Sequence, residues 1–227
     1  FLDQLGYFDM TKKYSEVFYE NQGTVRPPGD AYKLHPGYFS THKILTSIDW
    51  LTDHGAVMHQ LATHGLLSGD RAFIDRWTGP LEKACDFIVE ASAATGHGGV
   101  EGLLPPAVAT DDMIPIQAVW NIAWNYKGML TTVRLFEKIG HPKAAEYAAF
   151  LRQFKQTFVT EYRKIVEAGP RWTDSEGRER YKPSTVMTND PMKYHIYNDA
   201  FYLDTGPMVL VWAGLMEADD PIMVDVA

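Results

Sequence analysis

The sequence contains little of what several common classes of protein require. Cys85 is the only cysteine among 227 residues, which excludes an internal disulfide framework and any CxxC metal site. Positive charge is scarce, since 21 Lys and Arg stand against 29 Asp and Glu and the formal net charge is −8. Nucleic acids and anionic membrane surfaces attract basic proteins, and no apolar run is long enough to span a bilayer. We therefore expect neither a nucleic-acid partner nor a membrane.

Motifs for metals and cofactors are also absent. There is no HExxH zinc motif, no GxxxxGK[ST] phosphate loop and no complete dinucleotide-binding loop. His54, His59 and His64 are spaced by five, which spreads them around a helix, so we expect core or capping roles for them. The sequence thus predicts no metal and no cofactor. Its start at Phe1 shows neither a methionine nor a signal-peptide pattern, so we expect truncation at both ends and predict no compartment.

An internal repeat is the most informative feature that is present. Gly6, Gly69 and Gly140 each follow a mostly apolar stretch and precede an amphipathic one, and residues 217–221 resemble these segments. Glycine is the usual residue just past a helix end, and proline, as at Pro221, suits a helix start. Each segment therefore predicts the tight turn of an αα-hairpin. The intervals are too long for tetratricopeptide or armadillo repeats, which run roughly 34 to 47 residues.

The two helices of each predicted hairpin differ in character. Residues 54–69 contain no Asp, Glu, Lys or Arg, and neither do residues 113–126 or 205–216. A helix that is apolar nearly all round must be buried on most sides. After each turn charges return, and between Ala144 and Ile165 the apolar residues form a single stripe of helical spacing. We predict one inner and one outer helix per hairpin, with short turns on one rim and long loops on the other.

This pattern resembles the six-hairpin glycosidase superfamily. The resemblance rests on residues 59–74, on residues 101–106 with the following Asp111 and Asp112, and on residues 202–207 with the later 214–216 and Asp220-Pro221. It implies an all-α fold, an (α/α)6 toroid, with residues 1–227 forming about four of the six hairpins of one domain. The remaining hairpins of the parent chain would then complete the ring and could carry a catalytic group, leaving this part inactive alone.

Carboxylates at the long-loop rim are the predicted catalytic groups. Glycoside hydrolysis uses two carboxyl groups, one of which is kept protonated as the acid. Asp111 and Asp112 lie at the end of a long loop, and each can raise the other's pKa, although Asp before a helix is also a common N-cap. Glu101 lies among glycines in the same loop. Asp199 or Asp190, in the third loop, is the predicted second carboxylate.

Aromatic and amide side chains at the same rim are the predicted sugar-binding groups. Aromatic faces can stack on sugar rings, while carboxylates and amides bind hydroxyl groups. Trp120 and Trp124, four residues apart, share one helical face. Each candidate also has a structural alternative, because tryptophans pack in cores and Asn and Asp favour turns. The predicted binding residues are Asp49, Trp50, Trp120, Asn121, Trp124, Asp190, His195 and Asn198.

These features favour a glycoside hydrolase acting on a neutral oligo- or polysaccharide. The resemblance implies inversion of configuration, with water as the nucleophile. One alternative is a polysaccharide lyase or sugar epimerase, in which His195 beside Tyr194 and Tyr197 abstracts a proton and Arg or Lys holds a uronate. Another is a non-catalytic helical scaffold, which predicts an exposed apolar patch on the outer helices.

Overall fold

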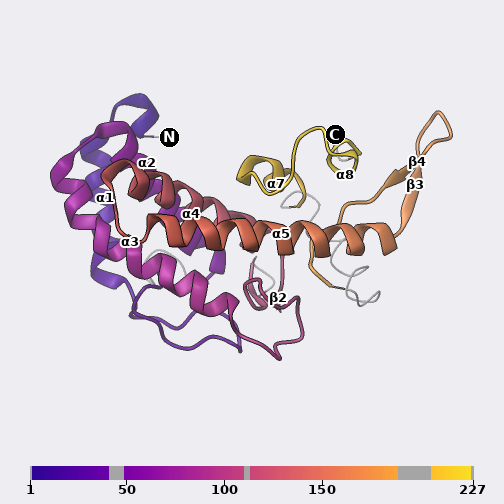
Figure 1. Cartoon of the computed structure of the whole chain (residues 1–227), viewed down its shortest axis with the longest axis horizontal. Helices are drawn as coiled ribbons and strands as arrows, with labels where there is room; N and C mark the ends of the chain where they lie inside the picture. The colour runs from indigo at the N-terminus through magenta and orange to yellow at the C-terminus, as the bar shows by residue number, and fades with distance from the viewer. Residues whose placement is uncertain (1, 41–48, 110–112, 189–205, 226–227) are drawn as a thin grey trace.

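The computed structural model describes residues 2–40, 49–109, 113–188 and 206–225, and there the chain is mostly helical, which confirms the all-α class. Figure 1 shows α1–α3 gathered at one end of the molecule and the β3–β4 hairpin at the other, beyond α5. The helices are η1 (Asp3–Leu5), α1 (Phe8–Asn21), α2 (Leu51–Ser68), α3 (Arg71–Ser92), α4 (Val119–Ile139), α5 (Ala144–Ala168), α7 (Met208–Ala213) and α8 (Pro221–Val224). The strands are β1 (Ala107–Val108), β2 (Pro115–Ile116), β3 (Arg171–Thr173) and β4 (Glu179–Tyr181).

The predicted turns at Gly69 and Gly140 are confirmed as tight connections between α-helices, whereas Gly6 follows only the short 3-10 helix η1. Gly6, Gly69 and Gly140 follow η1, α2 and α4, with φ angles of 80°, 63° and 72°. This left-handed backbone carries no steric penalty in glycine, so the chain reverses there. Directly after Gly69, the Asp70 carboxylate accepts the Phe73 N–H at 3.1 Å and caps the start of α3.

The predicted difference in burial is confirmed for α2 against α3 and for α4 against α5, and we keep the words inner and outer for the more and the less buried helices. α2 and α4 are buried around most of their circumference, whereas α3 and α5 are buried along one face only. On α5 that face consists of Ala144, Tyr147, Leu151, Phe154, Phe158, Tyr162, Ile165 and Val166. Apolar burial of this kind, at roughly 25 cal/mol per Å², is the main force that holds an amphipathic helix in place.

The two inner helices α2 and α4 run parallel to each other. Three contacts follow one another along the pair: Thr52 with Asn121 at 2.6 Å, His59 with Thr131 at 2.8 Å, and Leu66 with Lys138 at 3.2 Å. Because both residue numbers rise together, the helices point the same way and their first turns are neighbours. The outer helix α3 connects α2 to α4 along the chain and returns it to the end at which α2 began. The long loop before α4 therefore lies at the same end as the loop before α2.

Two glycines allow α2 and α4 to approach until their backbones touch. A Cβ atom on Gly128 would lie 2.3 Å from the Gly55 carbonyl oxygen, and one on Gly55 would lie 2.3 Å from the Trp124 carbonyl oxygen. Real Cβ atoms do not come this close to backbone, so only glycine fits at the crossing. This contact fixes how the two inner helices are rotated against each other.

The last hairpin differs from the prediction. α7 ends at Gly214, whose φ is 85°, and α8 starts only at Pro221, where the Asp220 carboxylate accepts the Ile222 N–H at 3.0 Å. Residues 217–221 therefore begin a helix as predicted, but the tight turn placed there is wrong. The left-handed glycine that ends the preceding helix occurs several residues earlier, so a longer connection separates the two helices.

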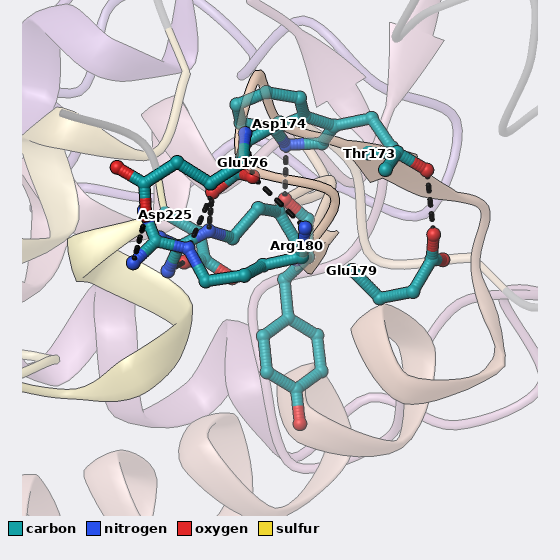
Figure 2. A network of polar contacts seen from close by, with 9 residues as sticks. Thr173, Asp174, Glu176, Glu179, Arg180 and Asp225 are labelled. Carbon is teal, nitrogen blue, oxygen red and sulfur yellow. Dashed lines mark hydrogen bonds and ion pairs between the residues drawn. The ribbon is translucent and has the colours of Figure 1, made fainter.

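Two short hairpins occupy the long loops, and the sequence did not predict them. β1 pairs with β2 before α4, and β3 pairs with β4 after α5. In the second hairpin Asp174 accepts hydrogen bonds from the N–H groups of Glu176 and Arg178, both at 2.9 Å, and from the Arg180 guanidinium at 3.0 Å (Figure 2). These bonds, from Arg178 above all, hold the pKa of Asp174 well below its usual range. Arg180 also binds Asp225 at 3.0 Å and so ties the hairpin to the end of α8.

Within the described residues, no helix combines the length and the apolar character that crossing a bilayer requires.

Candidate functional site

Several predicted site residues lie outside the part of the chain that the structure describes. These are Asp111, Asp112, Asp190, His195, Asn198 and Asp199. The helix that follows Asp112 in the sequence starts later than expected: α4 begins at Val119, and Ala118 is its N-cap residue. An N-capping role on α4, the structural alternative considered for Asp111 and Asp112, is therefore wrong. Their predicted catalytic role remains a prediction.

Glu101 is exposed and shapes its own loop. Its carboxylate accepts the N–H of Gly96 at 3.1 Å, five residues earlier. The loop between α3 and β1 is held further by Gln117, whose amide binds the N–H and carbonyl of Val100 at 2.7 and 3.0 Å. The contact to Gly96 is local and leaves Glu101 at the surface, so its catalytic role also remains a prediction.

Asn121 has a positioning role in the described contacts. Its Oδ1 accepts the Thr52 hydroxyl at 2.6 Å, and its Nδ2 donates to the carbonyls of Ala107 and Val108, both at 3.3 Å. The side chain is buried and its polar atoms are engaged inside the protein. Asn121 thus connects the first turns of α2 and α4 and anchors β1 beside them, which shapes the rim on which a ligand would lie.

Asp49 and Trp50 lie at the start of α2 and belong to a group of acidic and aromatic residues there. The sequence-based reasoning missed its third member, Asp53, in the first turn of α2. Asp53 is half-buried, and its Oδ2 atom is buried without a hydrogen-bond partner. Trp50 Nε1 is likewise buried and unpaired. Buried polar atoms are almost always paired in stable proteins, so a ligand that reached the start of α2 would find two unpaired atoms there.

Asp53 is electrostatically suited to carry a proton. Burial, together with the charge of Asp49, raises the pKa of Asp53 to about 7. Tyr38 is completely buried with its hydroxyl unpaired, and burial, assisted by Asp49 and Asp53, raises the pKa of its phenol well above the ordinary value. A carboxylic acid that remains partly protonated at neutral pH can act as a general acid.

Trp124, one of the two predicted tryptophans of α4, belongs to a larger set of side chains that we name the inner wall. Its members are Trp124, Lys127 and Arg134 from α4, His59 from α2 and Trp212 from α7. The Trp124 and Trp212 rings lie 4.4 Å apart between centroids, and His59 meets Trp212 edge-on at 5.5 Å. Trp120 continues the aromatic row, 5.8 Å from Trp124. Trp212 is 41% exposed, so its ring is the part of the row that is open to solvent.

Of the predicted binding residues, the structure brings together Trp120 and Trp124 in one row and Asp49 and Trp50 at the start of α2. The Thr52–Asn121 bond places the first turns of α2 and α4 side by side, so these two groups share one end of the helix pair.

The sequence contained signals for Asp53 and Trp212, the two site residues that were not predicted. Asp53 directly precedes the uncharged run of α2 and is one helical turn from Asp49, and Trp212 lies within the third uncharged run.

Among the described residues, no group of three or more His, Cys, Asp or Glu side chains is arranged to hold a metal ion. Comparison with known proteins gives no further guide to the site, because no protein-family model matches the chain and no curated protein matches it significantly.

Proposed function

We propose that the chain forms about four hairpins of an (α/α)6 toroid and belongs to a glycoside hydrolase that acts on oligo- or polysaccharides. Two described features support the toroid: α2 and α4 are parallel, and the outer helices α3 and α5 cover them. Repetition of this unit around a ring would place every long loop at one rim. The acidic and aromatic side chains at the starts of α2 and α4 lie at that rim.

In this mechanism Asp53 is the general acid. It donates its proton to the glycosidic oxygen as the bond from that oxygen to the anomeric carbon breaks, and a water molecule attacks the carbon from the opposite face. A second carboxylate takes the proton that the water loses; in an inverting enzyme the two carboxyl groups are roughly 6.5–9.5 Å apart. Asp111, Asp112 and Asp199, which the sequence predicts as catalytic carboxylates, are the candidates for this base. Asp49, whose charge raises the pKa of Asp53, helps to keep the acid protonated.

The outer helices give little support to a non-catalytic scaffold. Such a protein would expose an apolar patch on them. Among the described residues, α3 and α5 expose no large hydrophobic side chain, whereas α1 exposes Met10, Tyr14 and Tyr19 and α8 exposes Val224. The charged surfaces of α3 and α5 are instead those of helices that face solvent.

The observation that carries this proposal is the half-buried carboxyl of Asp53, whose Oδ2 atom has no hydrogen-bond partner, and the test replaces this side chain. In the full-length protein, assayed against a panel of aryl glycosides and oligosaccharides, we expect Asp53→Asn to lower kcat by about 10²–10⁴-fold. The matched control is Asp75→Asn, an exposed carboxylate on α3 that pairs with Arg71. We expect this control to retain wild-type turnover.

The leaving group provides a sharper readout. A dinitrophenyl glycoside releases dinitrophenolate, a leaving group that needs no protonation. If Asp53 is the acid, Asp53→Asn should therefore retain most of its activity on that substrate. Asp49→Asn should shift the basic limb of the pH–rate profile to lower pH, because it removes the charge that raises the pKa of Asp53. Wild-type turnover of unactivated oligosaccharides by Asp53→Asn would refute the assignment.

A further inference from the structure

The inner wall has a charge that contrasts with the rest of the molecule. The chain as a whole carries a formal charge of −8, yet α4 presents Lys127 and Arg134 on one face, two turns apart. Arg134 is exposed and forms no ion pair with any described residue. Lys127 is half-buried, donates to the Trp212 carbonyl at 3.0 Å, and lies 5.1 Å from the centre of the Trp212 ring. An ammonium group has three N–H donors, so two remain for another acceptor.

His59 adds a hydrogen-bond acceptor to the same wall. The Thr131 hydroxyl has one proton, which it donates to the Lys127 carbonyl at 2.8 Å, so its oxygen accepts the Nδ1–H of His59, also at 2.8 Å. This arrangement fixes the tautomer and leaves the lone pair of Nε2 available. Burial, together with the charge of Lys127, lowers the pKa of His59, which keeps the imidazole neutral. A neutral imidazole with a free Nε2 can accept a bond from a sugar hydroxyl.

Neither cation forms an ion pair with a carboxylate of the described residues. Burial and the nearby charge of Arg134 lower the pKa of Lys127, the opposite of what an ion pair does. Lys155 provides the comparison: it donates to the Gly214 carbonyl at 2.8 Å, just past α7, but its charge is also paired with Glu217 at 3.2 Å. Both lysines hold the end of α7, and only Lys127 does so without a described counter-charge.

We propose that the inner wall binds an acidic sugar unit, one that carries a carboxylate or sulfate group. The sugar ring would stack on Trp212 and Trp124, its anionic group would lie between Lys127 and Arg134, and a hydroxyl would donate to His59 Nε2. This inference rests on the proposed carbohydrate function and replaces the neutral substrate expected from the sequence with an anionic one.

Binding measurements on the full-length protein test the inference. The probes are a galacturonic acid trisaccharide, its methyl ester as the neutral match, and a sulfated trisaccharide, each followed by calorimetry and by tryptophan fluorescence. We expect an acidic trisaccharide to bind at least tenfold more tightly than the ester, and its affinity to fall with added salt. Preference for the uronate or for the sulfated probe identifies which anionic group the wall accepts.

Variants separate ligand binding from the structural role of the lysine. Lys127→Met and Arg134→Gln should each weaken binding of the acidic trisaccharide about 10- to 100-fold, as expected for a charge-assisted hydrogen bond, and leave the ester unaffected. Arg134 is exposed, so its replacement does not endanger the fold. Lys155→Met, which removes a similar bond to the end of α7, should leave the affinity unchanged.

The possible outcomes distinguish this inference from the proposed function. Equal binding of the acidic trisaccharide and its ester would overturn the inference and leave a glycoside hydrolase with a neutral substrate. Equal losses of affinity in Lys127→Met and Lys155→Met would show that the lysine only supports α7, and would also overturn it. Failure of every trisaccharide to bind would count against the inference and the carbohydrate function together.

Discussion

The contact between the inner helices α2 and α4 differs in kind from the contacts among the outer helices. α2 and α4 meet through backbone at Gly55 and Gly128 and through the buried amides of Asn121 and Asn125. The outer helices meet largely through long charged side chains. Their ion pairs include Lys12 with Asp70, Arg76 with Glu16, and Lys143 with Glu82 and Asp86.

This difference indicates where the structure is specified most tightly. Backbone contact and buried amides tolerate almost no change in helix rotation, because a shift creates a collision or leaves a polar group unpaired. Exposed ion pairs tolerate rearrangement and contribute little each. The inner helices carry both the candidate acid and the inner wall, so the precise part of the fold is also the part that positions the site.

The largest expected effect comes from disturbing the inner contact. Gly128→Ala places a Cβ about where the Gly55 carbonyl lies, 2.3 Å away, so we expect the free energy of unfolding to fall by about 3 kcal/mol or more. Gly65→Ala is the comparison, because a Cβ on Gly65 of α2 would meet only side-chain atoms, the nearest being Leu135 Cδ2 at 3.2 Å. We expect a change of less than about 1 kcal/mol there, because the higher helix propensity of alanine offsets the packing cost. Urea unfolding measures both, and similar small effects would refute backbone contact at the crossing.

An intermediate effect is expected from the acid on α2, and it depends on pH. The pKa of Asp53 is about 7 in the folded state and about 3.8 in the unfolded state, so its stabilising contribution is complete below pH 4 and is lost as the pH rises to 7. We therefore expect Asp53→Asn to be more stable than the wild type above pH 7, by about 1–2 kcal/mol after allowance for solvent screening, and to lack this pH dependence.

The neighbouring His54 acts in the opposite direction and must be separated from Asp53. Burial lowers the pKa of His54 to about 3, so protonation of the unfolded chain destabilises the fold as the pH drops below 6.5. Both proteins contain His54, so the difference between their unfolding free energies from pH 4 to 8 isolates Asp53. A difference that does not change with pH would show that the carboxyl titrates normally.

The smallest effect is expected at the outer surface. Arg76 pairs with Glu16 and lies over the Tyr19 ring at 4.0 Å, but both charged side chains are more than 40% exposed. We expect Arg76→Met to lower the free energy of unfolding by less than about 1 kcal/mol, and by still less in high salt. Thermal unfolding at two salt concentrations measures this. A loss as large as that of Gly128→Ala would mean that the outer contacts are equally specific.

The sequence located part of the candidate site but not its chemistry. Trp50 and Trp120 could be placed at the loop end of the inner helices, because helix starts follow from local pattern. Asp53 could not be identified as an unusual acid, since its pKa depends on burial and on Asp49 in the folded chain. Trp212 could not be paired with Trp124, because that contact joins helices almost 90 residues apart.

The sequence by itself determined where helices end and which of them are buried. Gly69 and Gly140 end helices wherever they are placed in space, and an uncharged helix must avoid water in any fold, so both properties are local. The tertiary structure alone decided how closely α2 and α4 approach, which side chains form the inner wall, and that its cations form no described ion pair. Those properties depend on how one helix is rotated against another, and Gly55 and Gly128 set that rotation only when they meet.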